Sequence, residues 1–154
     1  MKEKTCCFTG YRNIPEREIE YLRTRVEEEL EALIGKGVVY FGSGGARGFD
    51  LLAAETVIMM KEKYPHIKLI LVLPCADYMK LWKEDDIAEY EWVKHNADKV
   101  KVLSSIYYTG CMHTRNRHMV NCSSYCICYC RKNKGGTYYT KNYAIANKLK
   151  VIFI

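Results

Sequence analysis

Short apolar runs and longer periodic stretches alternate along this chain. The runs are rich in β-branched and aromatic residues, as in Ile67–Leu73, and predict strands. The longer stretches repeat apolar residues at three- and four-residue spacing, as in Ile19–Leu33, and predict amphipathic helices. Strands alternating with helices are typical of a parallel sheet covered by helices. The sequence therefore predicts a single α/β domain over residues 1–154, Rossmann-like and doubly wound, with a mostly parallel sheet and helices on both faces.

The elements follow from the same pattern. Strands are expected at residues 5–8, 38–41, 67–73, 100–103, 124–131 and 150–154, and helices over 19–33, 51–58, 85–97, from 113, and around 143–146. The continuous apolar character of residues 67–73 predicts a central strand, and residues 150–154 are expected to form a buried one.

A glycine-rich turn, Gly42–Gly48, separates a strand pattern from a helix pattern that begins near Leu51. A strand, a glycine turn and a helix together present backbone N–H groups and the positive end of a helix dipole to an anion. Glycine lets a phosphate approach the backbone because it has no Cβ. Arg47 adds a charged donor fork. The segment predicts a phosphate site, and the alternative is a tight turn that binds nothing.

Two features argue against NAD-dependent hydride transfer. The glycine spacing is Gly-x-Gly-x-x-x-Gly, which differs from the dinucleotide fingerprint Gly-x-Gly-x-x-Gly. The next predicted strand ends in Leu73–Cys75, where a ribose-binding carboxylate would otherwise be expected.

Three further polar loops follow predicted strands or precede predicted helices: Thr9–Arg12, Arg115–Arg117 and Gly135–Thr137. In open parallel sheets, ligands bind beyond the carboxyl ends of the strands. All four loops should gather there, so the sequence predicts a binding cleft. For the two arginines of Arg115–Arg117, the alternative is an exposed helix start that binds no ligand.

The composition limits the ligands and the cellular location that we expect. The net charge of +6 suits phosphorylated ligands or nucleic acid, although the lysines are scattered rather than clustered. No apolar run approaches the ~20 residues that span a bilayer, and the N-terminus does not have a signal-peptide pattern. We therefore expect a cytoplasmic protein with no membrane partner.

Eight cysteines are many for such a chain. Cys126, Cys128 and Cys130 alternate and should share one strand face. Their spacing is not the Cys-x-x-Cys of a zinc site. We predict small apolar core residues with no metal; the alternative is a metal or redox site that these cysteines form with Cys111, Cys122, His113 and His118.

Taken together, the motifs resemble those of the YpsA-like family within the SLOG superfamily, named for the Smf/DprA and LOG proteins. The matching segments are Thr9–Arg12, Ser43–Asp50, Arg115-Asn116-x-x-Met119-Val120, Gly135–Thr137 and Tyr143-Ala144. The resemblance implies a Rossmann-like sheet that binds nucleotides or molecules derived from them, and self-association. The superfamily includes enzymes, sensors and DNA binders, so the fold alone does not choose among them.

One difference from the superfamily motifs argues against the hypothesis that this protein is an enzyme. LOG-type phosphoribohydrolases carry Pro-Gly-Gly-x-Gly-Thr-x-x-Glu, whose Glu assists catalysis. Here the turn is Gly135–Lys141, with no carboxylate, which removes a group of a kind worth ~10²–10⁴-fold in rate. DprA-type proteins share the patterns of Ala46–Asp50 and Arg115–Arg117, but they bind single-stranded DNA with additional domains.

We therefore expect a sensor or regulatory domain that binds a phosphorylated nucleotide-like ligand, with no cofactor and no catalytic residue assigned. The expected ligand-binding residues are Thr9, Gly10, Arg12, Ser43, Gly44, Gly45, Arg47, Asp50, Arg115, Asn116, Gly135, Gly136 and Thr137. Arginines would neutralise phosphate, glycine N–H groups and hydroxyls would donate hydrogen bonds, and Asp50 would hold Arg47 or contact a ribose. The alternatives are a nucleoside-monophosphate phosphoribohydrolase and a DprA-type single-stranded DNA binder.

Overall fold

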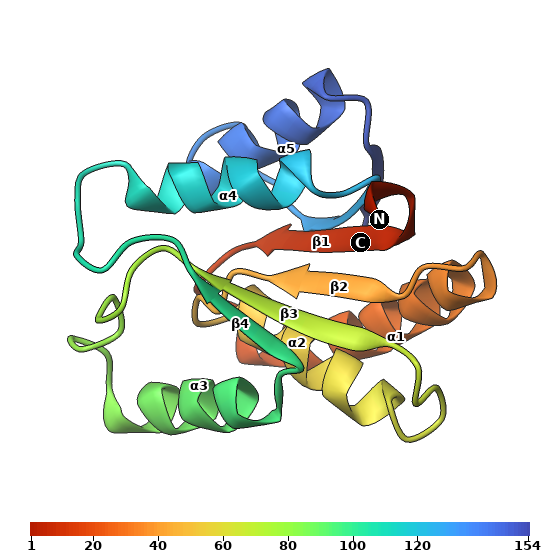
Figure 1. The fold of residues 1–154 in the computed structure, drawn as a ribbon, viewed down its shortest axis with the longest axis horizontal. Helices are drawn as coiled ribbons and strands as arrows, with labels where there is room; N and C mark the ends of the chain where they lie inside the picture. The colour runs from red at the N-terminus through yellow and green to blue at the C-terminus, as the bar shows by residue number, and fades with distance from the viewer.

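The computed structural model describes residues 1–154 as a six-stranded sheet in the order β4-β3-β2-β1-β5-β6, with every neighbouring pair parallel (Figure 1). The strands are β1 (Thr5–Gly10), β2 (Tyr40–Ser43), β3 (Lys68–Leu73), β4 (Lys99–Val102), β5 (Tyr125–Tyr129) and β6 (Lys150–Phe153). The helices are α1 (Ile19–Gly35), α2 (Phe49–Met60), α3 (Glu84–Asn96), α4 (Cys111–Asn121) and α5 (Gly136–Ala146), and short 3-10 turns cover Lys2–Lys4 and Glu16–Glu18. The predicted α/β fold is confirmed, and the sheet is entirely parallel.

The strand order reverses between β1 and β5. The chain builds outward from β1 to β4, returns through α4, and adds β5 to the free side of β1. Right-handed crossovers then place α1, α2 and α3 on one face of the sheet and α4 and α5 on the other, as Figure 1 shows. A sheet whose order reverses in this way leaves a crevice at the carboxyl ends of the two strands that flank the reversal, β1 and β5.

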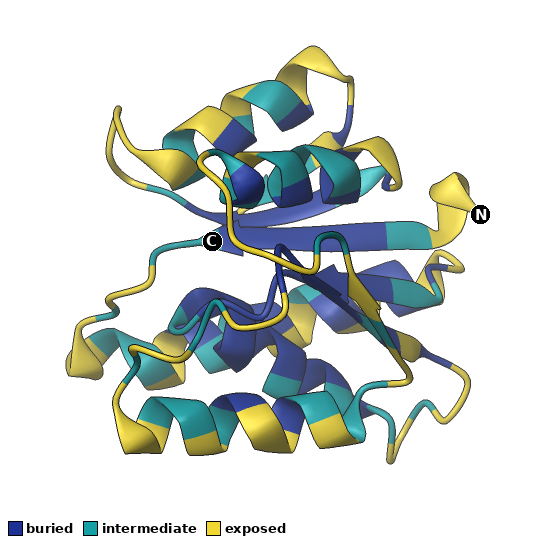
Figure 2. Ribbon diagram, turned by 60° about the vertical axis from the view of Figure 1, so that its left-hand side comes forward, coloured by how far each residue is buried: buried dark blue, intermediate teal, exposed yellow.

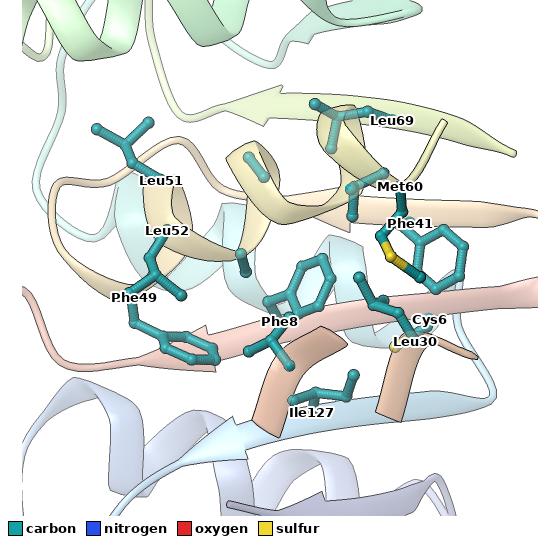
Figure 3. Packing of buried hydrophobic residues seen from close by; sticks show 14 of the residues in the cluster. Cys6, Phe8, Leu30, Phe41, Phe49, Leu51, Leu52, Met60, Leu69 and Ile127 are labelled. Carbon is teal, nitrogen blue, oxygen red and sulfur yellow. The ribbon is translucent and has the colours of Figure 1, made fainter. Parts of the chain in front are cut away.

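Two apolar clusters hold the layers together. Phe8, Phe41 and Ile127 point toward α1 and α2 in the larger cluster (Figure 3). Alternate positions of the same strands, Cys7 and Cys126 among them, pack in the smaller cluster beneath α4 and α5. Figure 2 shows the buried residues following the strands and the inward sides of the helices. Each central strand is therefore apolar on both faces, which is why its sequence reads as a continuous run.

Three expectations need correction or refinement. The final strand is not buried, because β6 is an edge strand with Lys150 and Phe153 exposed. Helix α4 begins at Cys111 rather than at His113. The predicted packing of the cysteines holds for six of the eight, which are buried, Cys126 and Cys128 of the smaller cluster among them. Cys130, just beyond β5, is half-buried on the same side, and Cys122 is exposed.

Candidate functional site

A cavity of about 730 Å³ opens at the reversal point of the sheet. Its walls come from the loop after β1, the first residues of α2, and the starts of α4 and α5. Eight of the residues expected from the sequence line it: Thr9, Gly10, Arg12, Asp50, Arg115, Asn116, Gly136 and Thr137. The volume lies in the usual range of small-molecule sites.

The other expected residues do not line this cavity. They are Ser43, Gly44, Gly45, Arg47 and Gly135. Ser43 Oγ donates to the carbonyl of Asp50 at 2.9 Å and accepts the N–H of Gly45 at 3.2 Å, so the hydroxyl braces the glycine turn. Arg47 faces a separate cavity of about 300 Å³, where its guanidinium donates to Asn13 Oδ1 at 3.3 Å.

The glycine turn before α2 is packed against the protein's own chain. The N–H of Phe49 donates to the carbonyl of Tyr11 at 3.0 Å, and the N–H of Ala46 donates to Asp50 Oδ2 at 3.3 Å. A Cβ on Gly48 would lie 2.6 Å from the carbonyl carbon of Arg12, and its φ of +83° is one that glycine favours. The glycines therefore allow close approach of the β1 loop. The expectation that this helix start presents free N–H groups to an anion is wrong for the N–H groups of Phe49 and Ala46, which donate within the chain.

Arg115 forms the floor of the cavity and is only 2% exposed. Its Nη1 donates to the carbonyls of Gly44 and, at 3.3 Å, Val72, while Nε donates to Asn116 Oδ1 at 2.8 Å. Burial lowers the pKa of Arg115, and the nearby charge of Asp50 opposes that change. A guanidinium stays charged even so. It ties the tip of β2 to the end of β3.

Asp50 is the carboxylate whose charge lies near Arg115 at the floor of the cavity. Burial raises its pKa, and the charges of Arg115 and Arg12, together with the N–H of Ala46, work in the opposite direction. Asp50 is the only carboxylate among the lining residues, which include the cations Arg12, Arg115 and Lys132. The cavity is consequently basic.

The tyrosine after β1 fixes the opposite wall. The hydroxyl of Tyr11 accepts the backbone N–H groups of Arg131 and Lys132, the latter at 2.7 Å, and the Lys132 ammonium lies 5.6 Å from the centre of the Tyr11 ring. This holds the β5–α5 loop beside the cavity. The same loop leads to Gly136 and Thr137, the first residues of α5, where the helix dipole is positive.

Residues 6–151 match the family model described as the YspA SLOG family (YpsA). The chain belongs to this family. A UPF0398 protein of Staphylococcus saprophyticus is 31% identical over 114 residues, 70% of this chain and 61% of the relative. Another, from Halalkalibacterium halodurans, is 32% identical over 114 residues, 70% of this chain and 60% of the relative. The chain thus spans about three fifths of the length of both relatives.

A solved structure shares the fold. It is that of DNA processing protein A from Helicobacter pylori, a protein described with a single-stranded DNA binding mode. The TM-score is 0.67 with 20% sequence identity, over 99% of this chain and 65% of that one. This likeness places the YspA SLOG chain in the same fold.

Several lining residues of this family member escaped sequence reasoning. They are Asn13, Tyr107, Met112, His113 and Lys132. Tyr11 also lines the cavity; it lies in the loop Thr9–Arg12 that was expected there, although it was not among the expected ligand-binding residues. Lys132 carried a usable signal, because it directly follows the strand expected at residues 124–131. Tyr107 and His113 did not, since the long loop between β4 and α4 that brings them to the cavity has no periodic pattern. Their position depends on where α4 crosses the sheet.

Two further structural findings concern other expectations. No group of three or more His, Cys, Asp or Glu side chains could hold a metal ion, so the cysteine and histidine residues considered above do not gather into such a site. No helix is both long and apolar enough to cross a bilayer.

Proposed function

We propose that this protein binds a phosphorylated nucleotide, or a molecule derived from one, in the cavity at the reversal of the sheet, and acts as a sensor or regulatory domain. The observation that carries the proposal is the meeting of Arg12, Lys132 and the start of α5 around one cavity with a single carboxylate. Phosphate is the common biological anion that suits clustered cations and a helix N-terminus together.

Each wall would serve one part of the ligand. Arg12 and Lys132 are exposed and would neutralise a phosphate. The first turn of α5, at Gly136 and Thr137, would donate N–H groups, and the Thr137 hydroxyl a further hydrogen bond. Asp50 suits a ribose hydroxyl, because a carboxylate accepts hydrogen bonds from a vicinal diol.

The remaining expected residues support the site from outside it. Ser43, Gly44 and Gly45 hold the β2 turn that positions Arg115 and Asp50. Arg47 faces another cavity, so the proposal keeps Arg12 among the arginines expected to neutralise a phosphate and leaves Arg47 out. The binding role of the cavity residues stays a prediction until a ligand is tested.

A second candidate function is single-stranded DNA binding. The observation that favours it is a group of aromatic rings at and next to the cavity. Tyr107 lines the cavity and is 65% exposed, and Tyr139 lies edge-on to the lining residue His113 with 4.9 Å between ring centres. Bases stack on such rings without sequence preference. Arg117 and Lys132 on the same side would contact the backbone phosphates.

A thermal-shift series separates these functions. The purified protein is heated with AMP, ADP, ADP-ribose or a twelve-residue oligothymidylate. A ligand at 100 times its Kd adds ~2.7 kcal/mol of stability. We expect a nucleotide to give the largest shift, Arg12→Ala and Lys132→Ala to reduce that shift, and the matched control Arg47→Ala to retain it.

Each alternative has its own result. Oligothymidylate alone stabilising the protein, with steep salt dependence, would select the DNA binder. Release of free base from AMP, followed by chromatography, would select the phosphoribohydrolase. Equal loss of the nucleotide shift in Arg47→Ala and Arg12→Ala would contradict the site assignment, and no shift with any compound would contradict the cavity as a ligand site.

A further inference from the structure

A second cavity, of about 510 Å³, lies over β2, β3 and β4 on the side of the sheet that carries α4. Its floor consists of Tyr40, Gly42, Ile70 and Val72, and one wall is the side of α4 that bears His118. It shares no lining residue with the cavity at the sheet reversal. We call it the β2–β4 groove.

The groove exists because α4 and α5 cover only part of this face of the sheet. Figure 1 shows α4 and α5 side by side above β1, whereas α1, α2 and α3 lie on the other side of the sheet. On the groove side, β4 presents Lys99 and Lys101, both exposed, and Tyr40 and Ile70 are only half-buried. A parallel sheet is normally covered on both faces by helices, so an open portion with an apolar floor stands out.

Gly42 deepens the floor. It pairs with Cys7 on one side and with Ile70 on the other, in the middle of the sheet. A Cβ added there would meet only the carbonyl oxygen of Cys6, at 3.9 Å, so the space above the residue is open. Glycine weakens a strand interior and often marks a place where another backbone approaches closely. No close contact within this chain requires glycine at this position.

The rim of the groove carries charge of one sign. Lys2, Lys99 and Lys101 line it, and none of the lining residues is Asp or Glu. His118 Nε2 lies 3.3 Å from Lys101 Nζ; burial first, and then the Lys101 charge, lower the pKa of His118, so the imidazole does not add to the charge at neutral pH. A docked surface must therefore combine apolar side chains with acidic ones at the edges.

We propose that the β2–β4 groove docks an amphipathic helix of a partner protein whose apolar stripe is bordered by Asp and Glu. A helix is the element that covers a parallel sheet face, and α4 already provides a neighbour for it to pack against. Its stripe lies on Ile70 and Val72, one side chain enters the hollow above Gly42, and its carboxylates meet Lys99 and Lys101. This completes the helical layer that α4 and α5 begin.

The test uses a displayed library of 18-residue helices with a fixed Leu stripe and flanking positions randomised between Glu and Lys. It is selected on the native protein and counter-selected on Gly42→Leu, which fills the hollow. Affinities of the enriched peptides are then measured by fluorescence anisotropy. We expect enriched sequences with Glu at the flanks, at least tenfold weaker binding to Gly42→Leu and to Lys99→Glu/Lys101→Glu, and unchanged binding to the control Lys36→Glu, which changes an exposed lysine outside the groove.

If Gly42→Leu failed to fold, the variant Lys99→Glu/Lys101→Glu would still test the proposal. Lys99 and Lys101 are exposed, so their replacement leaves the core intact. No Gly42-dependent binder, or binders with no preference for Glu over Lys, would overturn the proposal. A dimer of the native protein in sedimentation, abolished by Gly42→Leu, would overturn it in favour of a second copy of this chain.

Discussion

Arg115 and Asp50 come together over Gly44. A Cβ on this glycine would lie 2.7 Å from Cζ of Arg115 and 2.7 Å from Oδ2 of Asp50. The two side chains come from α4 and α2, on opposite faces of the sheet, and both are buried. The missing Cβ thus lets opposite charges from the two helical layers approach each other at the floor of the cavity. A buried charge without a partner would be costly.

Gly44→Ala should destabilise the protein, because the new methyl group occupies the space of Arg115 and Asp50. Overpacking of this kind costs ~1–3 kcal/mol. Urea denaturation at pH 7 measures the change. Gly42→Ala is the matched control in the same strand region, where a Cβ meets open space, and it should be neutral or slightly stabilising. Equal losses in both variants would contradict the role given to Gly44.

Gly48→Ala should cost more than Gly135→Ala. Both glycines have positive φ, +83° and +95°, so each substitution strains the backbone by ~1–3 kcal/mol. Only at Gly48 would the methyl group also collide with the backbone of Tyr11 and Arg12, whereas at Gly135 it meets nothing within 4 Å. The two free energies of unfolding, measured side by side, test whether the β1 loop is held by this close approach. A Gly48→Ala loss no larger than that of Gly135→Ala would show that it is not.

Glu89 should make stability fall as the pH rises. Burial, a hydrogen bond with Glu55 and the charges of Glu55 and Asp86 raise the pKa of Glu89 from 4.5 to about 8. Between these values the folded protein holds a proton that the unfolded chain has released, so the free energy of unfolding decreases from about pH 4.5 to about pH 8. Because the side chain is only half-buried, the screened effect is ~1 kcal/mol or less.

Melting curves from pH 5 to pH 9 follow this effect. Glu89→Gln should flatten the decline relative to the native protein and be the more stable of the two at pH 8. Glu91→Gln, on the exposed side of the same helix, should leave the native profile unchanged. If Glu89→Gln kept the same dependence of stability on pH as the native protein, Glu89 and Glu55 would not share a proton.

The arrangement of the cavity shows where sequence reasoning was sufficient. Thr9, Arg12 and Thr137 were placed correctly at the cavity because each lies next to a strand end or a helix start, and parallel strands end at a common edge. Arg47 was not, although it lies in the motif with the strongest phosphate pattern. The cavity that the Arg47 side chain faces depends on the loop after β1. This loop packs against Gly48, and Arg47 then faces the cavity of about 300 Å³.

The elements, their alternation and hence the parallel sheet with two helical layers could be predicted from the sequence, because apolar periodicity and glycine turns are local properties of the chain. Which turns line the cavity depends on long-range contacts. Arg115 contacts the carbonyl of Gly44 across 71 residues, and Tyr11 binds the loop at Lys132 across 121. Such contacts depend on strand order, which local patterns do not encode, and they closed the glycine turn of α2 while leaving the start of α5 at the cavity.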